Sequence, residues 1–193
     1  MIQKPMRLRK AAPYLILACG LMLLGIASLL LIIQDREPKG ESAVEPGSDC
    51  VQPSRVDFPA PPLRLTDLSL SEVHLADTRG DIVLLNTWAT WCPPCRAEMP
   101  DLQAYFEKYQ EQGFTLIGVN IGETREQVIQ FGLEYHLTFP LWLDPGEQSL
   151  RALQSISLPY SVVIDRGGEV RYAWSGATCI SALEAVVTPL LMQ

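Results

Sequence analysis

Histidine and an excess of positive charge are what this sequence of 193 residues most clearly lacks. With only two histidines, a metal site built from histidine ligands is not expected. The 15 lysines and arginines are outnumbered by 22 aspartates and glutamates, and a net charge of −7 argues against binding to nucleic acid. We also find no haem, flavin or nucleotide motif. Five cysteines are too few for a small fold stapled by disulfides, yet too many to ignore.

Charged residues are absent from one long stretch, residues 11–33. As a helix this stretch would be about 35 Å long, enough to cross a hydrocarbon core of about 30 Å. Four cations and no acid precede it, so the positive-inside rule places residues 1–10 in the cytoplasm and the rest of the chain outside. The stretch ends without the small-residue pattern of a cleavage site. We therefore expect a single-pass anchor in a bacterial cytoplasmic membrane, with a cleaved signal peptide as the alternative.

Large apolar side chains are scarce just after this predicted anchor. Residues 34–62 contain six prolines, and such a composition cannot bury a core. We interpret residues 34–56 as a proline-rich tether and residues 57–193 as a folded domain. Without its first 33 residues the chain keeps 11 cations and all 22 acids, so this outer part has a net charge of −11.

The domain alternates between strand-like and helix-like patterns, which predicts an α/β fold. We expect helices from the Cys92–Cys95 region to about Gln112 and over residues 124–136, 147–154 and 179–191. We expect strands over Leu63–Asp67, Glu72–Ala76, Ile82–Trp88, Phe114–Asn120, Phe139–Leu143, Tyr160–Ile164 and Glu169–Trp174.

Cys92 and Cys95 form a C-x-x-C pair, a motif with several interpretations. A zinc site would need two more ligands, but His74 and His136 lie 62 residues apart with no partner motif. Haem attachment would need histidine where Arg96 stands. A structural disulfide is a further alternative. Redox chemistry is favoured because a predicted strand precedes the pair and a predicted helix follows it.

The predicted position of Cys92 explains why the pair could be reactive. Free backbone N–H groups and the helix dipole stabilise a thiolate at a helix N-terminus. Pro93 and Pro94 fall in the first turn, where a missing N–H is tolerated. We expect Cys92 to be the exposed nucleophile that forms a mixed disulfide with the substrate. Cys95 is then the shielded thiol that resolves it.

The motif also carries a family resemblance. Residues 85–100, LNTWATWCPPCRAEMP, closely resemble the signature of the membrane-anchored TlpA/ResA/CcmG-type thioredoxins. The resemblance covers roughly residues 57–191; its W-C-P-P-C-R-A-E core is highly specific and the rest is looser. It implies a thioredoxin fold, a central mixed sheet flanked by helices, with TlpA-like N-terminal strands and a central insertion at about residues 121–143. It also implies an extracytoplasmic thiol–disulfide oxidoreductase that needs no cofactor beyond its own cysteine pair.

The same resemblance implies partners. Family members mostly act as reductants of the haem-binding cysteines of apocytochrome c or of thiols in copper-site assembly proteins. Their electrons come from a membrane thiol carrier of the DsbD/CcdA kind. An oxidase or isomerase remains an alternative, since C-P-P-C alone does not fix the reduction potential. So does a module that holds Cu(I) or an apoprotein without turnover, although only Met99 lies nearby as an extra soft ligand. We do not find the Thr/Arg set of a peroxidase.

Two further catalytic residues are implied by the resemblance. Pro159 matches the family's cis-proline, which faces the cysteine pair and exposes backbone for substrate pairing; the alternative is an ordinary trans proline. It follows Leu158 and precedes Tyr160, where threonine is more usual. Glu98 matches the family's acid near the pair. Plain thioredoxin instead has an aspartate in the position of Asn86, so we expect the proton-transfer carboxylate at Glu98. It would accept the Cys95 proton or raise the thiol pKa values by charge repulsion; the alternative is an acid that caps the helix dipole.

We expect the substrate to be bordered by Trp91, Pro93 and Leu158. Trp88 and Trp91 flank the cysteine pair and would shape an apolar rim around it. Simple packing in the core and on the surface is the alternative for both tryptophans.

Cys50 and Cys179 are the remaining cysteines of the outer part of the chain, whereas Cys19 falls inside the predicted anchor. Free thiols are unusual in an oxidising compartment. We predict a structural disulfide between Cys50 and Cys179 that ties the tether to the last helix. Two unpaired thiols or a copper-handling role are the alternatives, and no metal site is predicted.

Overall fold

The computed structural model describes residues 50–193. The predicted anchor at residues 11–33, most of the predicted tether and Cys19 lie outside the described residues. None of the helices within residues 50–193 has the length and apolarity needed to cross a membrane.

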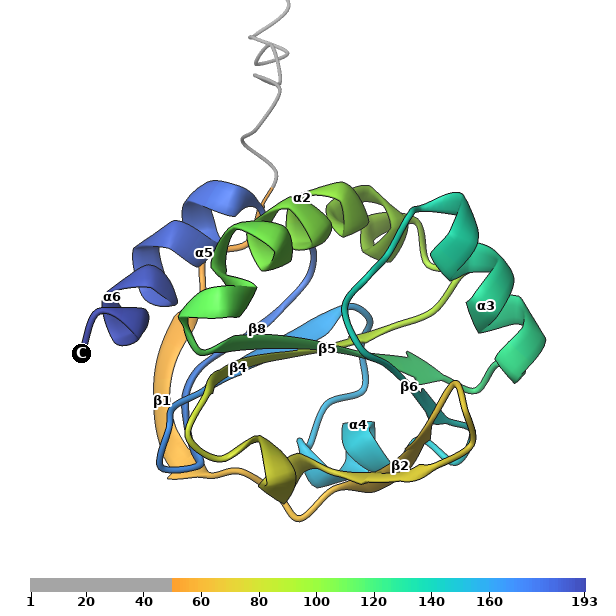
Figure 1. The fold of residues 1–193 in the computed structure, drawn as a ribbon, viewed down its shortest axis with the longest axis horizontal. Helices are drawn as coiled ribbons and strands as arrows, with labels where there is room; N and C mark the ends of the chain where they lie inside the picture. Colours follow the sequence, from red (N-terminus) through yellow and green to blue (C-terminus); the bar gives the residue numbers. More distant parts are fainter. Residues whose placement is uncertain (1–49) are drawn as a thin grey trace, which may run out of the picture. The chain divides into compact units, whose positions relative to one another are not determined.

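A mixed sheet of eight strands forms the centre of the domain (Figure 1). Its strand order is β1-β8-β7-β4-β5-β6-β2-β3. The three strands β4, β5 and β6 are parallel, and the other neighbouring pairs are antiparallel. The strands are β1 (Ser54–Pro59), β2 (Arg64–Asp67), β3 (Glu72–His74), β4 (Ile82–Trp88), β5 (Phe114–Ile121), β6 (Leu141–Asp144), β7 (Tyr160–Ile164) and β8 (Glu169–Ser175).

Helices cover both faces of this sheet. In Figure 1, α2, α3, α5 and α6 lie on one side and α4 on the other. The α-helices are α2 (Pro93–Tyr109), α3 (Arg125–Glu134), α4 (Gln148–Ala152), α5 (Ile180–Val186) and α6 (Thr188–Leu191). Two short 3-10 helices, η1 (Leu75–Thr78) and η2 (Gln110–Gln112), precede β4 and β5.

The central strand β4 shows why the sheet has two cores. Every residue of β4 is buried. Ile82, Leu84 and Trp88 join the core under α2 and α3, whereas Val83 and Leu85 join the core on the opposite face. Successive side chains of a strand point to opposite faces, so a strand covered on both sides is apolar throughout. Full burial of each such side chain is worth about 1.5–3 kcal/mol.

Most predicted elements are confirmed. The strands β4 and β7 have the predicted bounds, and β5 and β8 each run one residue further. The helix α2 continues through Pro100 to Tyr109, and η2 then leads to Gly113, whose φ of +76° ends the helical segment. Glycine adopts this left-handed conformation without steric penalty, as its place at the helix stop predicted.

Other boundaries differ from the prediction by more than one residue, and two of these differences have a clear physical reason. The strand β6 begins at Leu141 rather than Phe139, because Pro140 has no N–H to donate to the sheet. The predicted helix over 179–191 is two helices, α5 and α6, with Pro189 in the first turn of the second.

The largest difference is β1, which the sequence assigned mainly to the tether. The strand begins at Ser54, three residues before the predicted start of the domain, and pairs with β8 at the edge of the sheet. Only Val56 and Phe58 of this strand pack against the core. With only two inward-facing apolar residues between flanking prolines, the alternation of apolar and polar residues is too short to tell an edge strand from a linker in the sequence.

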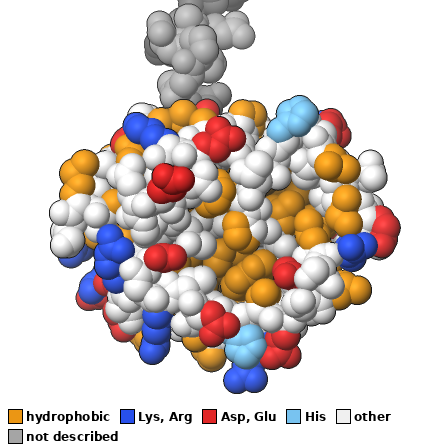
Figure 2. Space-filling view, in the orientation of Figure 1, with side chains coloured by type: hydrophobic (Ala, Val, Ile, Leu, Met, Phe, Trp, Pro, Cys, Tyr) orange, Lys and Arg blue, Asp and Glu red, His pale blue; other side chains and the backbone are white. Residues whose placement is uncertain are grey.

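The surface has no large cationic region on the face shown in Figure 2. Apolar side chains gather near the centre of that face, and acidic side chains are spaced around them. This distribution agrees with the net negative charge of the chain.

Candidate active site

The cysteine pair lies where the chain passes from the central strand to the longest helix. β4 ends at Trp88, and Cys92 is the N-cap of α2. Its sulfur accepts a hydrogen bond from the Cys95 amide at 3.3 Å, and the two prolines occupy the first positions of the helix, as predicted. The sulfurs of Cys92 and Cys95 form a disulfide, with the Cα atoms 5.3 Å apart.

The structure corrects the expectation that Cys92 is exposed. In the disulfide form Cys92 is 3% exposed and Cys95 is 0% exposed. The order of accessibility agrees with the predicted roles, but both sulfurs are largely covered. The reason is that the Cys92 sulfur turns inward, toward its bonded partner and the amide that starts the helix.

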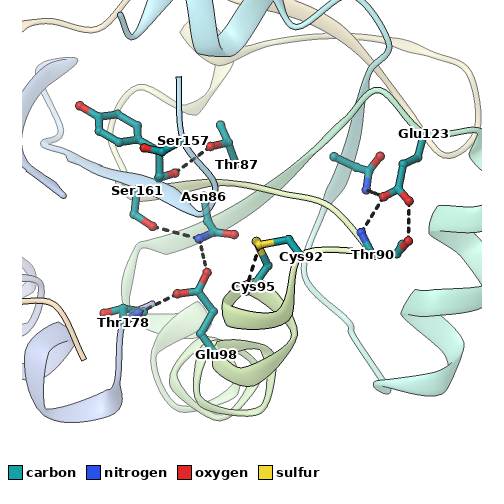
Figure 3. The surroundings of a disulfide bond; sticks show 12 residues. Asn86, Thr87, Thr90, Cys92, Cys95, Glu98, Glu123, Ser157, Ser161 and Thr178 are labelled. Carbon is teal, nitrogen blue, oxygen red and sulfur yellow. Dashed lines mark hydrogen bonds between the residues drawn. A yellow bond between two sulfur atoms is a disulfide. The ribbon is translucent and has the colours of Figure 1, made fainter. Parts of the chain in front are cut away.

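Glu98 is the acidic group closest in sequence to the pair. It lies three residues after Cys95 on α2, so the two side chains are neighbours on one face of the helix. Its carboxylate is buried and accepts from Asn86 Nδ2 at 2.8 Å and from the Thr178 amide at 2.7 Å. Figure 3 shows Glu98 between these two donors, beside the disulfide.

The environment of Glu98 suits proton transfer. Burial raises its pKa from 4.5 to about 7, against the two hydrogen bonds, which lower it. Desolvation penalises the charged carboxylate more than the two donors stabilise it. A carboxylic acid that titrates near neutral pH can both accept and release a proton under ordinary conditions. Its complete burial at the first turns of α2 does not suit a solvent-exposed cap of the helix dipole.

Asn86 joins Glu98 to the strand that follows the cis-proline. The Asn86 amide also donates to Ser161 Oγ at 2.9 Å, and the two residues are paired in the antiparallel register of β4 and β7. A second link joins Thr87 Oγ1 to the Tyr160 carbonyl at 3.1 Å. Asn86, which stands where the resemblance places the aspartate of plain thioredoxin, therefore donates to the carboxylate of Glu98.

The peptide bond between Leu158 and Pro159 is cis, the geometry that the sequence predicts. Pro159 is buried, and its carbonyl accepts from the Gly176 amide at 2.9 Å. Leu158 is half-buried directly before it.

A pocket of about 490 Å³ borders Cys92. It brings together the three predicted substrate contacts, Trp91, Pro93 and Leu158. Trp91 is 67% exposed on its rim, whereas Trp88 is fully buried against Phe131, with ring centroids 4.7 Å apart. Trp91 therefore shapes the rim, and Trp88 belongs to the core. The other lining residues come from β5, α4 and the loop after it: Ile121, Glu147, Leu150, Arg151, Ser155 and Ile156.

The sequence did not predict Glu123, which holds the loop just before Cys92. Its carboxylate accepts from the Thr90 amide at 2.6 Å, from the Thr90 hydroxyl, and from Asn120 Nδ2 at 2.7 Å (Figure 3). Three donors on one carboxylate fix the backbone that enters the motif. The sequence marks Glu123 only weakly, since this residue lies in an ordinary polar turn between β5 and α3.

The other two cysteines are joined. Cys50 and Cys179 form a disulfide across a sequence separation of 129 residues. Cys179 is the N-cap of α5, and neither cysteine is fully buried.

Comparison with known proteins gives consistent similarities. The model of the AhpC/TSA family matches residues 56–173. The thiol-disulfide oxidoreductase ResA of Geobacillus kaustophilus (strain HTA426) is 41% identical over 117 residues, which cover 61% of this chain and 67% of that protein. ResA of Bacillus subtilis (strain 168) is 31% identical over 156 residues, covering 81% of this chain and 82% of that protein.

Solved structures agree on the fold. A putative thiol:disulfide interchange protein DsbE from Chlorobium tepidum superimposes with a TM-score of 0.66 and 28% identity, over 72% of this chain and 98% of that one. A secreted thiol-disulfide isomerase from Corynebacterium glutamicum gives a TM-score of 0.69 over 77% of this chain and 96% of that one. Its identity of 23% supports a likeness of fold alone.

Proposed function

Since the chain belongs to the AhpC/TSA family and is a ResA-like thiol–disulfide oxidoreductase with a thioredoxin-like fold, we propose that it is a membrane-anchored, extracytoplasmic reductant of client disulfides. The clients are proteins of cytochrome c or copper-oxidase maturation. One observation carries the proposal: the Cys92–Cys95 disulfide lies at a helix N-terminus, between an apolar pocket and a buried acid.

The proposed reaction begins from the dithiol. The Cys92 thiolate attacks one sulfur of the client disulfide; the client S–S bond breaks, and the other client sulfur leaves as a thiolate. Cys95 then loses its proton and attacks Cys92, so the mixed disulfide breaks and the second client thiolate leaves. Two electrons pass from the pair to the client. The protein is left with the Cys92–Cys95 disulfide that the structure contains.

Glu98 is the proposed acceptor of the Cys95 proton. Its pKa of about 7 lets the carboxylate take the proton in this step and return it when the disulfide is reduced again. Asn86 and the Thr178 amide hold the carboxylate in place through both steps.

The client is proposed to lie across the pocket as an extended segment. Trp91 and Pro93 contact it on the side of the motif, and the backbone before Pro159 pairs with it on the other side. The size and mainly apolar lining of the pocket support a polypeptide rather than a small charged thiol.

The proposed cellular setting comes from the sequence. The uncharged residues 11–33 would anchor the chain in a bacterial cytoplasmic membrane and leave the domain on its outer, periplasmic or extracytoplasmic, side. The strands β1 to β3 would be the TlpA-like N-terminal strands, and residues 121–143 the central insertion. A membrane thiol carrier of the DsbD/CcdA kind would return electrons to the pair.

The reduction potential of the Cys92–Cys95 couple tests the direction of the reaction. The full-length chain is equilibrated in thiol–disulfide buffers of graded potential and then alkylated. Peptide mass spectrometry counts this couple separately from Cys50–Cys179. We expect a value near or below about −220 mV, toward the range of thioredoxin. A value of about −120 to −180 mV would instead identify an oxidase or isomerase.

A matched pair of variants tests the pocket. Trp91 and Leu133 are both exposed, at 67% and 65%, but only Trp91 lines the pocket beside Cys92. We expect Trp91→Ala to raise KM about tenfold for reduction of a disulfide-bonded Cys-x-x-Cys-His peptide, since an aromatic anchor is worth more than about 1 kcal/mol. Leu133→Ala should leave KM unchanged. Equal KM values in the two variants would remove the pocket from the proposal.

A further inference from the structure

The segment between β8 and α5 contacts both catalytic elements outside the cysteine motif. The Gly176 amide donates to the carbonyl of Pro159 at 2.9 Å. Two residues later, the Thr178 amide donates to Glu98 at 2.7 Å. Figure 3 shows the backbone of Thr178 on the side of Glu98 opposite to Asn86. Residues 176–179, here called the bridging segment, therefore connect the buried acid to the cis-proline.

The bridging segment is held from its other side by the start of the described chain. Cys179 is bonded to Cys50, and the Val51 amide donates to the Ala177 carbonyl at 2.8 Å. Gly176 has a φ of +106°, and a Cβ added there would lie 2.7 Å from Cγ2 of Val51. Only glycine permits this approach of the two segments.

Beyond these contacts, the bridging segment is held where the Cys179 carbonyl accepts from the Leu183 amide at 3.1 Å. It belongs to no strand or helix, and Cys179 makes no side-chain capping bond at the start of α5. The Ile180 amide lies 3.3 Å from Asp101 Oδ2, near the upper limit for a hydrogen bond. The covalent bond to Cys50 is thus the strongest restraint on the backbone that carries the Thr178 amide.

We infer that the Cys50–Cys179 disulfide is a positioning element of the redox site. It holds the bridging segment so that the Thr178 amide keeps its hydrogen bond to Glu98 and the Gly176 amide keeps its hydrogen bond to the Pro159 carbonyl. The inference rests on the proposed role of Glu98 in proton transfer. It goes beyond a purely stabilising disulfide, because it couples Cys50–Cys179 to the ionisation of an acid beside the other pair.

The electrostatic consequence follows from the groups that face Glu98. Asn86 of β4 and the Thr178 amide donate to it, Cys95 of the disulfide lies one turn before it on α2, and Asp101 lies about one turn after it. A donor to the charged carboxylate lowers its pKa. If the bridging segment loosens, the Thr178 bond weakens while Glu98 stays buried, so its pKa should rise.

The test is a direct titration of Glu98 by NMR in the full-length, oxidised chain. Glutamate is labelled at the side-chain carboxyl carbon, and the Glu98 signal is assigned by its absence in Glu98→Gln. We expect an inflection near pH 7 in the wild type. In the double variant Cys50→Ser/Cys179→Ser it should move upward by about one pH unit, the tenfold effect of one hydrogen bond to a charged group.

Two further variants make the result decisive. Gly176→Ala keeps the disulfide but pushes the bridging segment away from Val51, so it should also raise the inflection, and it decides the question if the double variant does not fold. Thr115→Val removes a part-buried hydrogen bond to Asp81 near the start of β5, away from the site, and should leave the inflection unchanged. An unchanged inflection in every folded variant of the bridging segment overturns the inference. If the inflection shifts as expected but the wild-type protein does not reduce client disulfides, the proposed function is overturned instead, and the inference about the disulfide stands.

Discussion

The two disulfides of this protein have nearly the same span, with Cα separations of 5.3 Å for Cys92–Cys95 and 5.5 Å for Cys50–Cys179. Each also contributes the N-cap of a helix: Cys92 for α2, of 17 residues, and Cys179 for α5, of 7 residues. Their surroundings differ. The Cys92 sulfur accepts a hydrogen bond from the Cys95 amide, and Cys92 borders a pocket. Cys179 makes no side-chain capping bond and is more accessible to solvent.

This difference shows that accessibility alone does not make a disulfide reactive. The redox pair is the more buried of the two. What distinguishes it is an aligned helix N-terminus that stabilises a thiolate and an acid that titrates near pH 7 beside the second sulfur. The second disulfide caps a helix of only 7 residues, is connected to Glu98 only through the backbone of the neighbouring Thr178, and closes a much longer loop.

The largest expected effect is on activity, because only the Cys92–Cys95 pair, and not Cys50–Cys179, should be needed for client reduction. We expect Cys92→Ser to abolish reduction of client peptides, because no other described thiol lies at a comparable helix N-terminus. Cys95→Ser should trap the client on Cys92 as a mixed disulfide, since the resolving thiol is gone. Non-reducing mass spectrometry detects this adduct. A client trapped on Cys50 or Cys179 would contradict the assignment of roles.

The next largest expected effect is a difference between the two disulfides in their contribution to stability. Loss of a disulfide that closes a loop of 129 residues should lower the free energy of unfolding by up to about 4–5 kcal/mol, on the loop-entropy model. The same model gives about 2 kcal/mol for the short Cys92–Cys95 loop. Urea unfolding of Cys50→Ser/Cys179→Ser and of Cys92→Ser/Cys95→Ser measures both. A larger loss in the second double variant would reverse the comparison.

The acid beside the redox pair should appear in the pH dependence of stability. Glu98 has a folded-state pKa of about 7 and a reference value of 4.5. Between these values the native state binds more protons than the unfolded state, so stability falls as pH rises. The full difference is about 3 kcal/mol, present below pH 4.5 and lost above pH 7.

Unfolding in denaturant at pH 4.5 and pH 8, with both disulfides intact, tests this linkage. The wild type should lose about 3 kcal/mol more than Glu98→Gln over this range. The comparison between the two proteins cancels the other titrating groups. Parallel pH profiles would mean that Glu98 is ionised throughout the range in the folded protein.

The smallest expected effect concerns the loop that enters the redox motif. Glu123 accepts three hydrogen bonds, including both from Thr90, whereas the bridging segment directly before Cys179 gives Glu98 a single hydrogen bond, from the Thr178 amide. We expect Glu123→Gln to lower the free energy of unfolding by about 1–3 kcal/mol and to speed hydrogen exchange at the Thr90 amide.

Glu126→Gln is the control for this prediction. Glu126 is exposed at the start of α3, and its ion pair with Arg125 is long, at 3.8 Å. Such a surface pair contributes little, so stability and exchange at Thr90 should stay at wild-type values. Unchanged Thr90 exchange in Glu123→Gln would show that the loop is held by other contacts.

The sequence by itself determined much of this protein. The strand-like pattern over Ile82–Trp88 predicted β4 with the bounds that the structure has. The C-P-P-C motif predicted a cysteine at a helix N-terminus, and the resemblance located Glu98 and the cis peptide before Pro159. These features are local, because each depends on residue types at fixed spacing along a short segment.

Only the tertiary structure decided how these parts are connected. The Thr178 amide donates to Glu98 across 80 residues of sequence, and Glu123 holds Thr90 across 33. Both contacts use a backbone N–H, which every residue except proline possesses, so no sequence pattern marks them. The edge strand β1 has the same origin, because it pairs with the distant strand β8. Burial in such packing also gives Glu98 its raised pKa.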